Sequence, residues 1–183
     1  AEPDALIYGG MEESATEQDI YRAADAGRME QLIRSAHLNA GEHLYIPAGL
    51  VHAIGAGHLI AEIQQNSDTT YRLYDWNRTD DSGRGRELHL KQALDSIREF
   101  RELSRDPRYL SDTPHFTSRE YRLDRGERFI PQDASRFAVL TVLQGGVGWD
   151  GRKATQGEFI LSPVRSAAVT ATEPDTVLLS TTV

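Results

Sequence analysis

The sequence predicts a mainly β chain with two β-rich parts and a few helices. The 183 residues include fifteen glycines and seven prolines, which is typical of a chain with many turns. Short runs of β-forming residues, bounded by glycine and proline, recur along most of the chain. Apolar residues at helical spacing are confined to two stretches, so the helices are the minority.

Composition excludes several classes of function. Acidic residues number 28 and basic residues 20, which gives a net charge of −8 and argues against nucleic acid as a partner. No apolar run approaches the ~20 residues of a membrane helix, so we expect no membrane partner and a cytoplasmic location. Cysteine is absent, so any metal must bind histidine, carboxylate or amide ligands.

The first helical stretch is predicted over residues 14–35, as a helical insert in the first β-rich part. Thr16 and Asp19 have the spacing of a capping box, with Asp in place of the preferred Glu. Gly27 is expected to end the first helix, and a second short turn is expected to follow it.

Strands are predicted next, over residues 43–46, 58–64 and 70–74, with a polar loop over 77–86. A second helix is predicted over 88–103. Its apolar residues recur at helical spacing and are Leu90, Ala93, Leu94, Ile97 and Phe100.

A linker over residues 104–113 is expected to separate two domains, 1–103 and 114–183. The second domain contains strand patterns and no helical one. Its predicted strands are 116–123, 137–143, 158–161, 167–171 and 176–181.

The strongest motif is G-x5-P-x-G-x2-H, formed by Gly41, Pro47, Gly49 and His52. The glycines and the proline favour tight turns on either side of a short strand. His52 then re-enters the sheet, where its imidazole is a candidate metal ligand; the alternative is a core histidine bonded to a backbone carbonyl. The motif resembles the second motif of the cupin superfamily of small metal-binding β-barrels, although Ala56 stands where its closing Asn is usual.

A partial second copy of this motif begins 116 positions later, at Gly157 and Pro163. Arg165 replaces the motif's second glycine and Ala168 replaces its histidine. A repeat that keeps the turn and loses the ligand indicates a second, degenerate cupin-like barrel that holds no metal.

The segment after His52 narrows the resemblance to one family. It reads H-A-I-G, then E-x-Q-Q-N-S-D-x-T-Y-R-x-Y-D-W from Glu62 to Trp76, and R-E-L-H from Arg86 to His89. This resembles the short bacterial form of type I phosphomannose isomerase. The resemblance implies a cupin-type β-barrel or sandwich, with the first barrel incomplete, followed by the degenerate second barrel. It also implies a zinc-dependent enzyme that interconverts mannose 6-phosphate and fructose 6-phosphate through an enediol.

The resemblance also assigns residues. His52 matches a zinc ligand, and Glu62 and Arg72 match a Glu and an Arg ten residues apart, of which the Arg is a catalytic residue. Glu62 is a candidate acid/base or polar anchor. Arg78 stands where long-form relatives carry a lysine, which suggests a phosphate contact. On the pattern of a regular strand, Gln64 shares the face of Glu62 and is expected to contact sugar hydroxyls. The alternative for Glu62 is a purely structural ion pair with Arg72.

One departure limits the resemblance. The family's other metal ligands lie in upstream Q-x-H and K-x-E segments, and neither occurs in this sequence. We therefore expect a C-terminal portion of such an enzyme, with weak or no zinc binding by this chain alone. Its partners would be a sugar phosphate and either the missing N-terminal portion or a second copy. The alternatives are a non-enzymatic sugar-binding or regulatory cupin, or an inert fragment.

Overall fold

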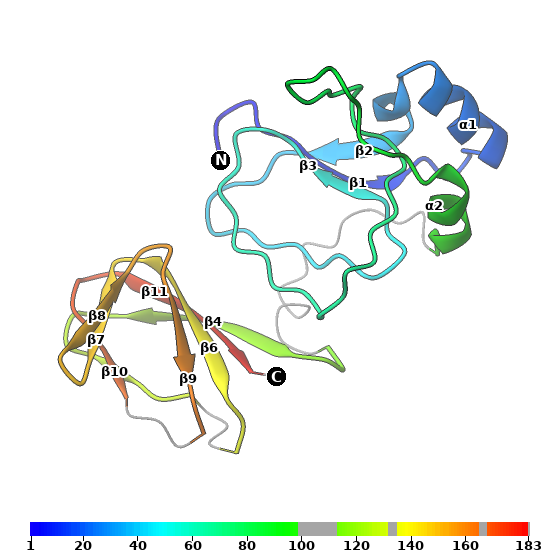
Figure 1. The fold of residues 1–183 in the computed structure, drawn as a ribbon. Helices are drawn as coiled ribbons and strands as arrows, with labels where there is room; N and C mark the ends of the chain where they lie inside the picture. The colour runs from blue at the N-terminus through cyan, green and yellow to red at the C-terminus, as the bar shows by residue number, and fades with distance from the viewer. Residues whose placement is uncertain (99–112, 132–134, 165–167, 183) are drawn as a thin grey trace. The chain divides into compact units, whose positions relative to one another are not determined.

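The structure is a computed structural model that describes residues 1–98, 113–131, 135–164 and 168–182. The chain divides into two compact units (Figure 1). The first comprises Ala1–Ile60 with Asn66–Arg105, and the second comprises Ala61–Gln65 with Asp106–Val183.

The first unit is built on a three-stranded antiparallel sheet. Strand β1 (Ile7–Met11) lies between β2 (Ile33–Ala36) and β3 (His52–Ile54) (Figure 1). Ile7 pairs with Ala36 on one side and with Ile54 on the other. In the described residues the first unit is therefore an open sheet, with β2 and β3 as its outer strands.

The predicted insert over residues 14–35 is helical only in part. Helix α1 (Glu17–Asp25) begins at the capping box, in which Thr16 accepts from the Asp19 amide (3.2 Å) and Asp19 accepts from the Thr16 amide (3.0 Å). The 3₁₀ turn η1 (Met29–Gln31) follows Gly27, whose φ of +64° suits a residue without a Cβ. The insert prediction was wrong at its end, because Ile33 starts β2 and pairs with Met11.

Helix α2 spans Leu90–Ser96, so the prediction of 88–103 was wrong at its C-terminal end. Ile97 already has extended backbone, with ψ at 121°. The next amide, of Arg98, donates to the Gly49 carbonyl (3.2 Å), and this tertiary bond draws the chain off the helix axis. The remaining predicted positions, 99–103, lie outside the described residues.

The core of the first unit joins the sheet, both helices and the segment that follows β3. Met11, Ile20 and Met29 are almost completely buried, and Ile33, Leu73 and Ala93 complete the cluster. Leu73 anchors the segment 71–89 to this core, which fixes the loops described below.

The strands predicted over 43–46, 58–64 and 70–74 are absent, apart from an isolated bridge at Tyr45. β-Forming residues become a strand only where another strand offers hydrogen bonds, and the described sheet of the first unit has three members. Leu59, which is 91% exposed, has no sheet to cover. These stretches are irregular backbone instead.

The second unit is a sandwich of two four-stranded antiparallel sheets, ordered β5-β10-β7-β8 and β4-β11-β6-β9 (Figure 1). Both sheets contribute to one core, including Leu140, Val142 and Leu178 from one and Val147 from the other. The prediction of a mainly β fold is confirmed. The strands are β4 (Thr117–Leu123), β5 (Arg128–Phe129), β6 (Ala138–Gln144), β7 (Gly146–Trp149), β8 (Arg152–Thr155), β9 (Phe159–Ser162), β10 (Val169–Ala171) and β11 (Thr176–Thr182).

Five of these strands, β4, β6, β9, β10 and β11, match the predicted ones within two residues. β5, β7 and β8 were not predicted. β7 and β8 form a hairpin around Asp150 and Gly151, whose φ values of 45° and 74° are those of a tight two-residue turn. In the partial second motif, Gly157 has φ +85° and Ala168 directly precedes β10, while Arg165 lies outside the described residues; its equivalence to the first motif stays a prediction.

No helix in the described ranges is long and apolar enough to cross a membrane.

Candidate functional site

The site is organised by a strained turn over Asp75–Arg78. The Arg78 amide donates to the Asp75 carbonyl (3.0 Å), which closes a four-residue turn. Its two central residues, Trp76 and Asn77, have φ of 50° and 52°. Such a turn ordinarily carries Asn or Gly at these positions, so a tryptophan there is unusual and costs backbone energy.

Aromatic contacts hold this turn against the first unit. The Trp76 ring lies 5.4 Å from that of Tyr8 on β1 and 5.1 Å from that of Tyr74, measured between centroids. The Tyr74 hydroxyl donates to the Gly27 carbonyl (2.9 Å) at the end of α1, and burial raises the pKa of this hydroxyl. The turn is thereby fixed to both β1 and α1.

The loop after the turn folds back on itself and returns Arg86 toward Asp75. Thr79 and Gly85 form an antiparallel bridge. At the tip, the Asp80 carboxylate accepts from the Ser82 hydroxyl (2.6 Å) and amide (2.9 Å) and from the Arg84 amide (3.0 Å). These bonds lower the pKa of the Asp80 carboxyl, and the bond from the Ser82 hydroxyl has the largest effect.

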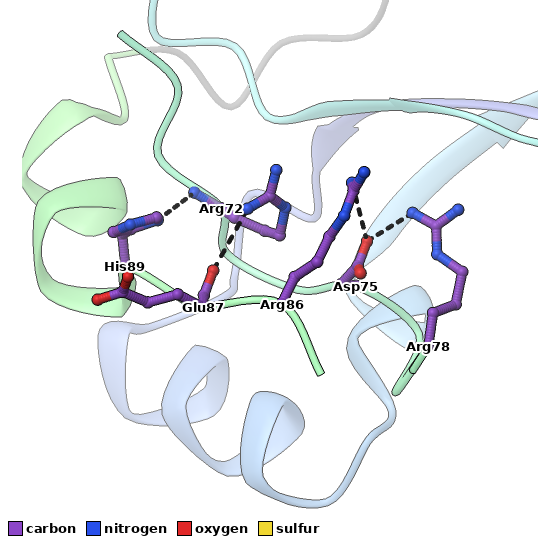
Figure 2. Close-up of polar contacts among 6 residues, drawn as sticks. All are labelled: Arg72, Asp75, Arg78, Arg86, Glu87 and His89. Atoms are coloured by element: carbon purple, nitrogen blue, oxygen red, sulfur yellow. Dashed lines mark hydrogen bonds and ion pairs between the residues drawn. The ribbon is translucent and has the colours of Figure 1, made fainter. Parts of the chain in front are cut away.

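Asp75 lies between Arg86 and Arg78 (Figure 2). Its side chain is 8% exposed, and Oδ1 accepts from Arg78 at 2.5 Å with Arg86 at 3.9 Å. Arg72 also attracts this carboxylate. The Arg78 hydrogen bond, with these charges, holds the pKa of Asp75 below its usual range despite burial. The second oxygen, Oδ2, is buried without a hydrogen-bond partner.

Arg72 is positioned by the segment just before α2. The His89 amide donates to the Arg72 carbonyl (2.8 Å), and the Arg72 amide donates to His89 Nδ1 (3.3 Å). The Arg72 guanidinium donates to the Glu87 carbonyl (3.3 Å) (Figure 2). We call Arg72, Arg78 and Arg86 the arginine cluster; Asp75 stands at its centre.

The structure thus brings together two of the predicted site residues, Arg72 and Arg78, through a carboxylate that sequence reasoning did not assign. Asp75 and Arg86 were both in the quoted motif, but neither received a role. The available signal was an aspartate with arginines three positions before, three after and eleven after it. This spacing becomes informative only when the loop after the turn is known to bring Arg86 back toward Asp75.

His52 begins β3, pairs with Gly9 and is exposed. Its Nδ1–H donates to the Leu50 carbonyl (2.9 Å), so Nε2 carries the free lone pair that a metal ligand needs. The turns of the motif form as predicted: Gly41 and Gly49 have φ of 85° and 89°.

A single histidine does not make a zinc site. Within the ranges that the structure describes, no group of three His, Asp or Glu side chains could hold a metal ion. These residues therefore do not fit a complete zinc centre, although His52 suits one ligand position.

Glu62 and Gln64 are exposed and lie in the Ala61–Gln65 segment, which groups with the second unit. The regular strand that was to place them on one face is absent. Their roles, like the role of Arg72 beside the sugar, stay predictions.

Asp75→Asn should lower the free energy of unfolding by about 1–2 kcal/mol at pH 7, because it removes a charged acceptor from Arg78 and Arg86, themselves largely exposed. The folded-state pKa lies below the unfolded one, so this stabilisation is complete above the unfolded value near 4. It is lost as the pH falls through the folded pKa.

Urea unfolding between pH 7 and 3 should show the stabilities of the wild-type chain and Asp75→Asn converging, with exposed Asp81→Asn as control. A constant gap down to pH 3 would contradict the charge pairing.

The curated relatives that match this chain are described as mannose-6-phosphate isomerases. The chain is 31% identical to the mannose-6-phosphate isomerase of Streptococcus mutans over 172 residues, which is 86% of this chain and 53% of that protein. It is 45% identical to mannose-6-phosphate isomerase ManA of Bacillus subtilis over 92 residues, 50% of this chain and 29% of that protein. The chain thus spans about half the length, or less, of these curated relatives. No family profile matches it.

Solved structures support the same fold. The mannose 6-phosphate isomerase of Bacillus subtilis superposes with a TM-score of 0.80 at 21% identity, covering 100% of this chain and 62% of that one. A putative mannosephosphate isomerase of Archaeoglobus fulgidus gives 0.69 at 11% identity, covering 97% and 57%. The family resemblance predicted from the motifs is confirmed, and the chain is a homologue of the mannose-6-phosphate isomerases with their cupin-type fold.

Proposed function

We propose that this chain works as a mannose-6-phosphate isomerase, interconverting mannose 6-phosphate and fructose 6-phosphate through an enediol. The observation that carries the proposal is its 31% identity, over 172 residues, to the enzyme of Streptococcus mutans. The arginine cluster supports it, because guanidinium groups suit phosphate and enediolate oxygens. A phosphorylated sugar as substrate also supports a cytoplasmic location.

The reaction transfers one proton from C2 of the aldose to C1 of the ketose, while the hydroxyl and carbonyl oxygens exchange one proton. Negative charge develops on the enediolate oxygens between these two steps. The guanidinium of Arg72 would stabilise that charge. Arg78 would hold the phosphate. Glu62 would serve as acid or base and Gln64 would contact sugar hydroxyls.

Zinc is the proposed cofactor, with His52 Nε2 as one ligand. Bound zinc would polarise the substrate carbonyl. Because the described residues include no group of three side chains that could hold a metal ion, the steps above are assigned to side chains alone. We expect zinc titration of this chain to give weak or no binding. His52→Ala should abolish any binding that is seen, and unchanged binding in that variant would exclude His52 as a ligand.

A non-enzymatic sugar-phosphate-binding cupin is the second candidate. The observation in its favour is that no three metal-ligating side chains gather in the ranges described. A coupled assay for fructose 6-phosphate, beside a calorimetric titration with mannose 6-phosphate, separates the two functions. Turnover supports the isomerase, whereas tight binding without turnover supports the binding protein.

Arg78→Ala should raise KM for mannose 6-phosphate about 10- to 100-fold and leave kcat nearly unchanged, because it removes a charge-assisted contact made equally in ground and transition states. Steady-state kinetics on the folded protein measure this. Arg84→Ala, which removes the same charge at the neighbouring loop tip, is the control. An Arg78→Ala enzyme with normal KM and reduced kcat would reject the phosphate role.

A further inference from the structure

We propose that Asp75 is a positioning residue, whose buried carboxylate holds Arg78 and Arg86 as a receptor for the phosphate dianion of the substrate. This inference rests on the proposed function. It goes beyond it by assigning Asp75 and Arg86, and by separating the residue that holds the cluster from those that touch the ligand.

The contacts place Asp75 at the base of the cluster. One oxygen, Oδ1, faces both guanidinium groups, at 2.5 Å from Arg78 and 3.9 Å from Arg86. Arg78 precedes the 79–85 loop and Arg86 follows it, so the carboxylate joins the two ends of that loop. Without it, two flexible side chains would have to be ordered by the ligand itself, at an entropic cost to binding.

The guanidinium groups of Arg78 and Arg86 remain accessible to an anion. The Arg78 and Arg86 side chains are 66% and 62% exposed, whereas that of Asp75 is 8% exposed. Each guanidinium has five N–H donors, and the contact with Asp75 Oδ1 leaves most of them free of the carboxylate. The Glu87 side chain runs toward His89, away from Arg78 and Arg86 (Figure 2).

The charge balance also favours a dianion. Three guanidinium groups act on one carboxylate, so the arginine cluster keeps an excess of positive charge in a chain whose net charge is −8. A small anion is attracted to a local positive site on an acidic protein. The negatively charged surface elsewhere on the protein does not attract it. The two negative charges of a phosphate match that excess.

This site carries two costs, one in the backbone and one in a side chain, that a merely stabilising loop would not need. Trp76 and Asn77 both have positive φ, and the Asp75 Oδ2 atom is buried without a hydrogen-bond partner. Strain and unpaired polar atoms of this kind gather at functional sites. Here the strained turn places Asp75 and Arg78 at its two ends, where their side chains face each other.

The experiment compares Asp75→Asn with Asp80→Asn on this chain. Asp80→Asn is the matched control, because Asp80 orders the tip of the same loop through Ser82 and Arg84 without touching the arginine cluster. NMR of the arginine Nε–Hε groups reports ordering of Arg78 and Arg86. Calorimetry with inorganic phosphate, mannose 6-phosphate and unphosphorylated mannose, at constant ionic strength, reports binding.

In Asp75→Asn we expect the Arg78 and Arg86 Nε–Hε signals to broaden and the affinity for inorganic phosphate to fall about tenfold, while that for mannose stays unchanged. Asp80→Asn should keep both properties. Arg86→Gln, which leaves the Asp75–Arg78 pair in place to hold the fold, should also weaken phosphate binding severalfold. If Asp75→Asn does not fold, Arg86→Gln still tests the receptor, and broad Arg78 and Arg86 Nε–Hε signals in the wild-type chain would overturn the positioning role.

Each contrary result overturns a different claim. Ordered arginines and full phosphate affinity in Asp75→Asn would overturn the positioning role and leave the proposed function intact. Unchanged phosphate affinity in Arg86→Gln would remove Arg86 from the receptor. A wild-type chain with ordered arginines that binds neither phosphate nor mannose 6-phosphate would overturn the receptor, and with it the phosphate role in the proposed function.

Discussion

Replacing Arg72 with alanine is expected to lower isomerase turnover about a hundredfold, while changing the free energy of unfolding by less than about 1 kcal/mol. The kinetic loss follows from the proposed role: one charge-assisted contact to a developing enediolate is worth on the order of 3 kcal/mol in the transition state. Because that contact is absent in the ground state, kcat and kcat/KM should fall together.

The small effect on stability follows from the contacts of Arg72. Its guanidinium makes one long hydrogen bond, 3.3 Å, to the Glu87 carbonyl at an exposed position. The bonds that join Arg72 to His89 and fix this segment use the Arg72 backbone, which alanine retains. Arg72 also attracts Asp75, but two other arginines lie closer to that carboxylate. Removing this attraction should therefore change the stability only slightly.

Turnover and melting temperature should be measured on the same Arg72→Ala preparation, with Arg84→Ala as the control for charge. The competing view was an ion pair with a buried Glu62, whose loss would cost 3–5 kcal/mol. Glu62 is exposed, which weakens that view. Strong destabilisation with normal turnover in the folded fraction would restore it and reject the catalytic role.

The second unit was largely predictable because its longest strands pair with other strands along most of their length. β4, β6 and β11 are seven residues each and pair along most of their length, and β6 and β11 are rich in β-branched and apolar residues. The strands that were missed, β5, β7 and β8, are two to four residues long and contain glycine or charged side chains. Their pairing partners, not their own composition, make them strands.

The first unit was less predictable for the same reason. The composition of residues 58–64 and 70–74 favours strands, but the three-stranded sheet in the described residues offers them no ladder. The predicted end of α2 also failed, because the bond from Arg98 to Gly49 joins positions far apart in the sequence. Tertiary contacts overrode local preference in both cases.

The candidate site shows where sequence motifs stop being informative. Arg72 and Arg78 were found by resemblance, and both lie in the arginine cluster. Asp75 was not, because its importance comes from burial and from a loop that brings Arg86 back beside it. The spacing of the arginines around Asp75 shows neither property by itself.

Leu178→Ala should destabilise the second unit by about 2–5 kcal/mol, the largest stability effect that we expect from a single substitution. Leu178 is fully buried in β11, the strand between β4 and β6, where it lies opposite Tyr121 and Val142. Alanine would leave a cavity that neighbouring strands, hydrogen-bonded along their length, cannot close. Leu161→Ala is the matched control on the same sheet: Leu161 is 66% exposed on the outer strand β9, so its loss should change stability by less than about 0.5 kcal/mol.

Trp149 gives a direct readout of this difference, because it is partly buried on β7 against the same core. The chain has two tryptophans, so a Trp76→Phe background isolates its fluorescence during urea unfolding. The Leu178→Ala midpoint should move to lower urea with a similar slope, since the surface exposed on unfolding is nearly the same. Equal shifts for Leu178→Ala and Leu161→Ala would mean that burial in the sandwich does not set its stability, and would reject the two-sheet core described above.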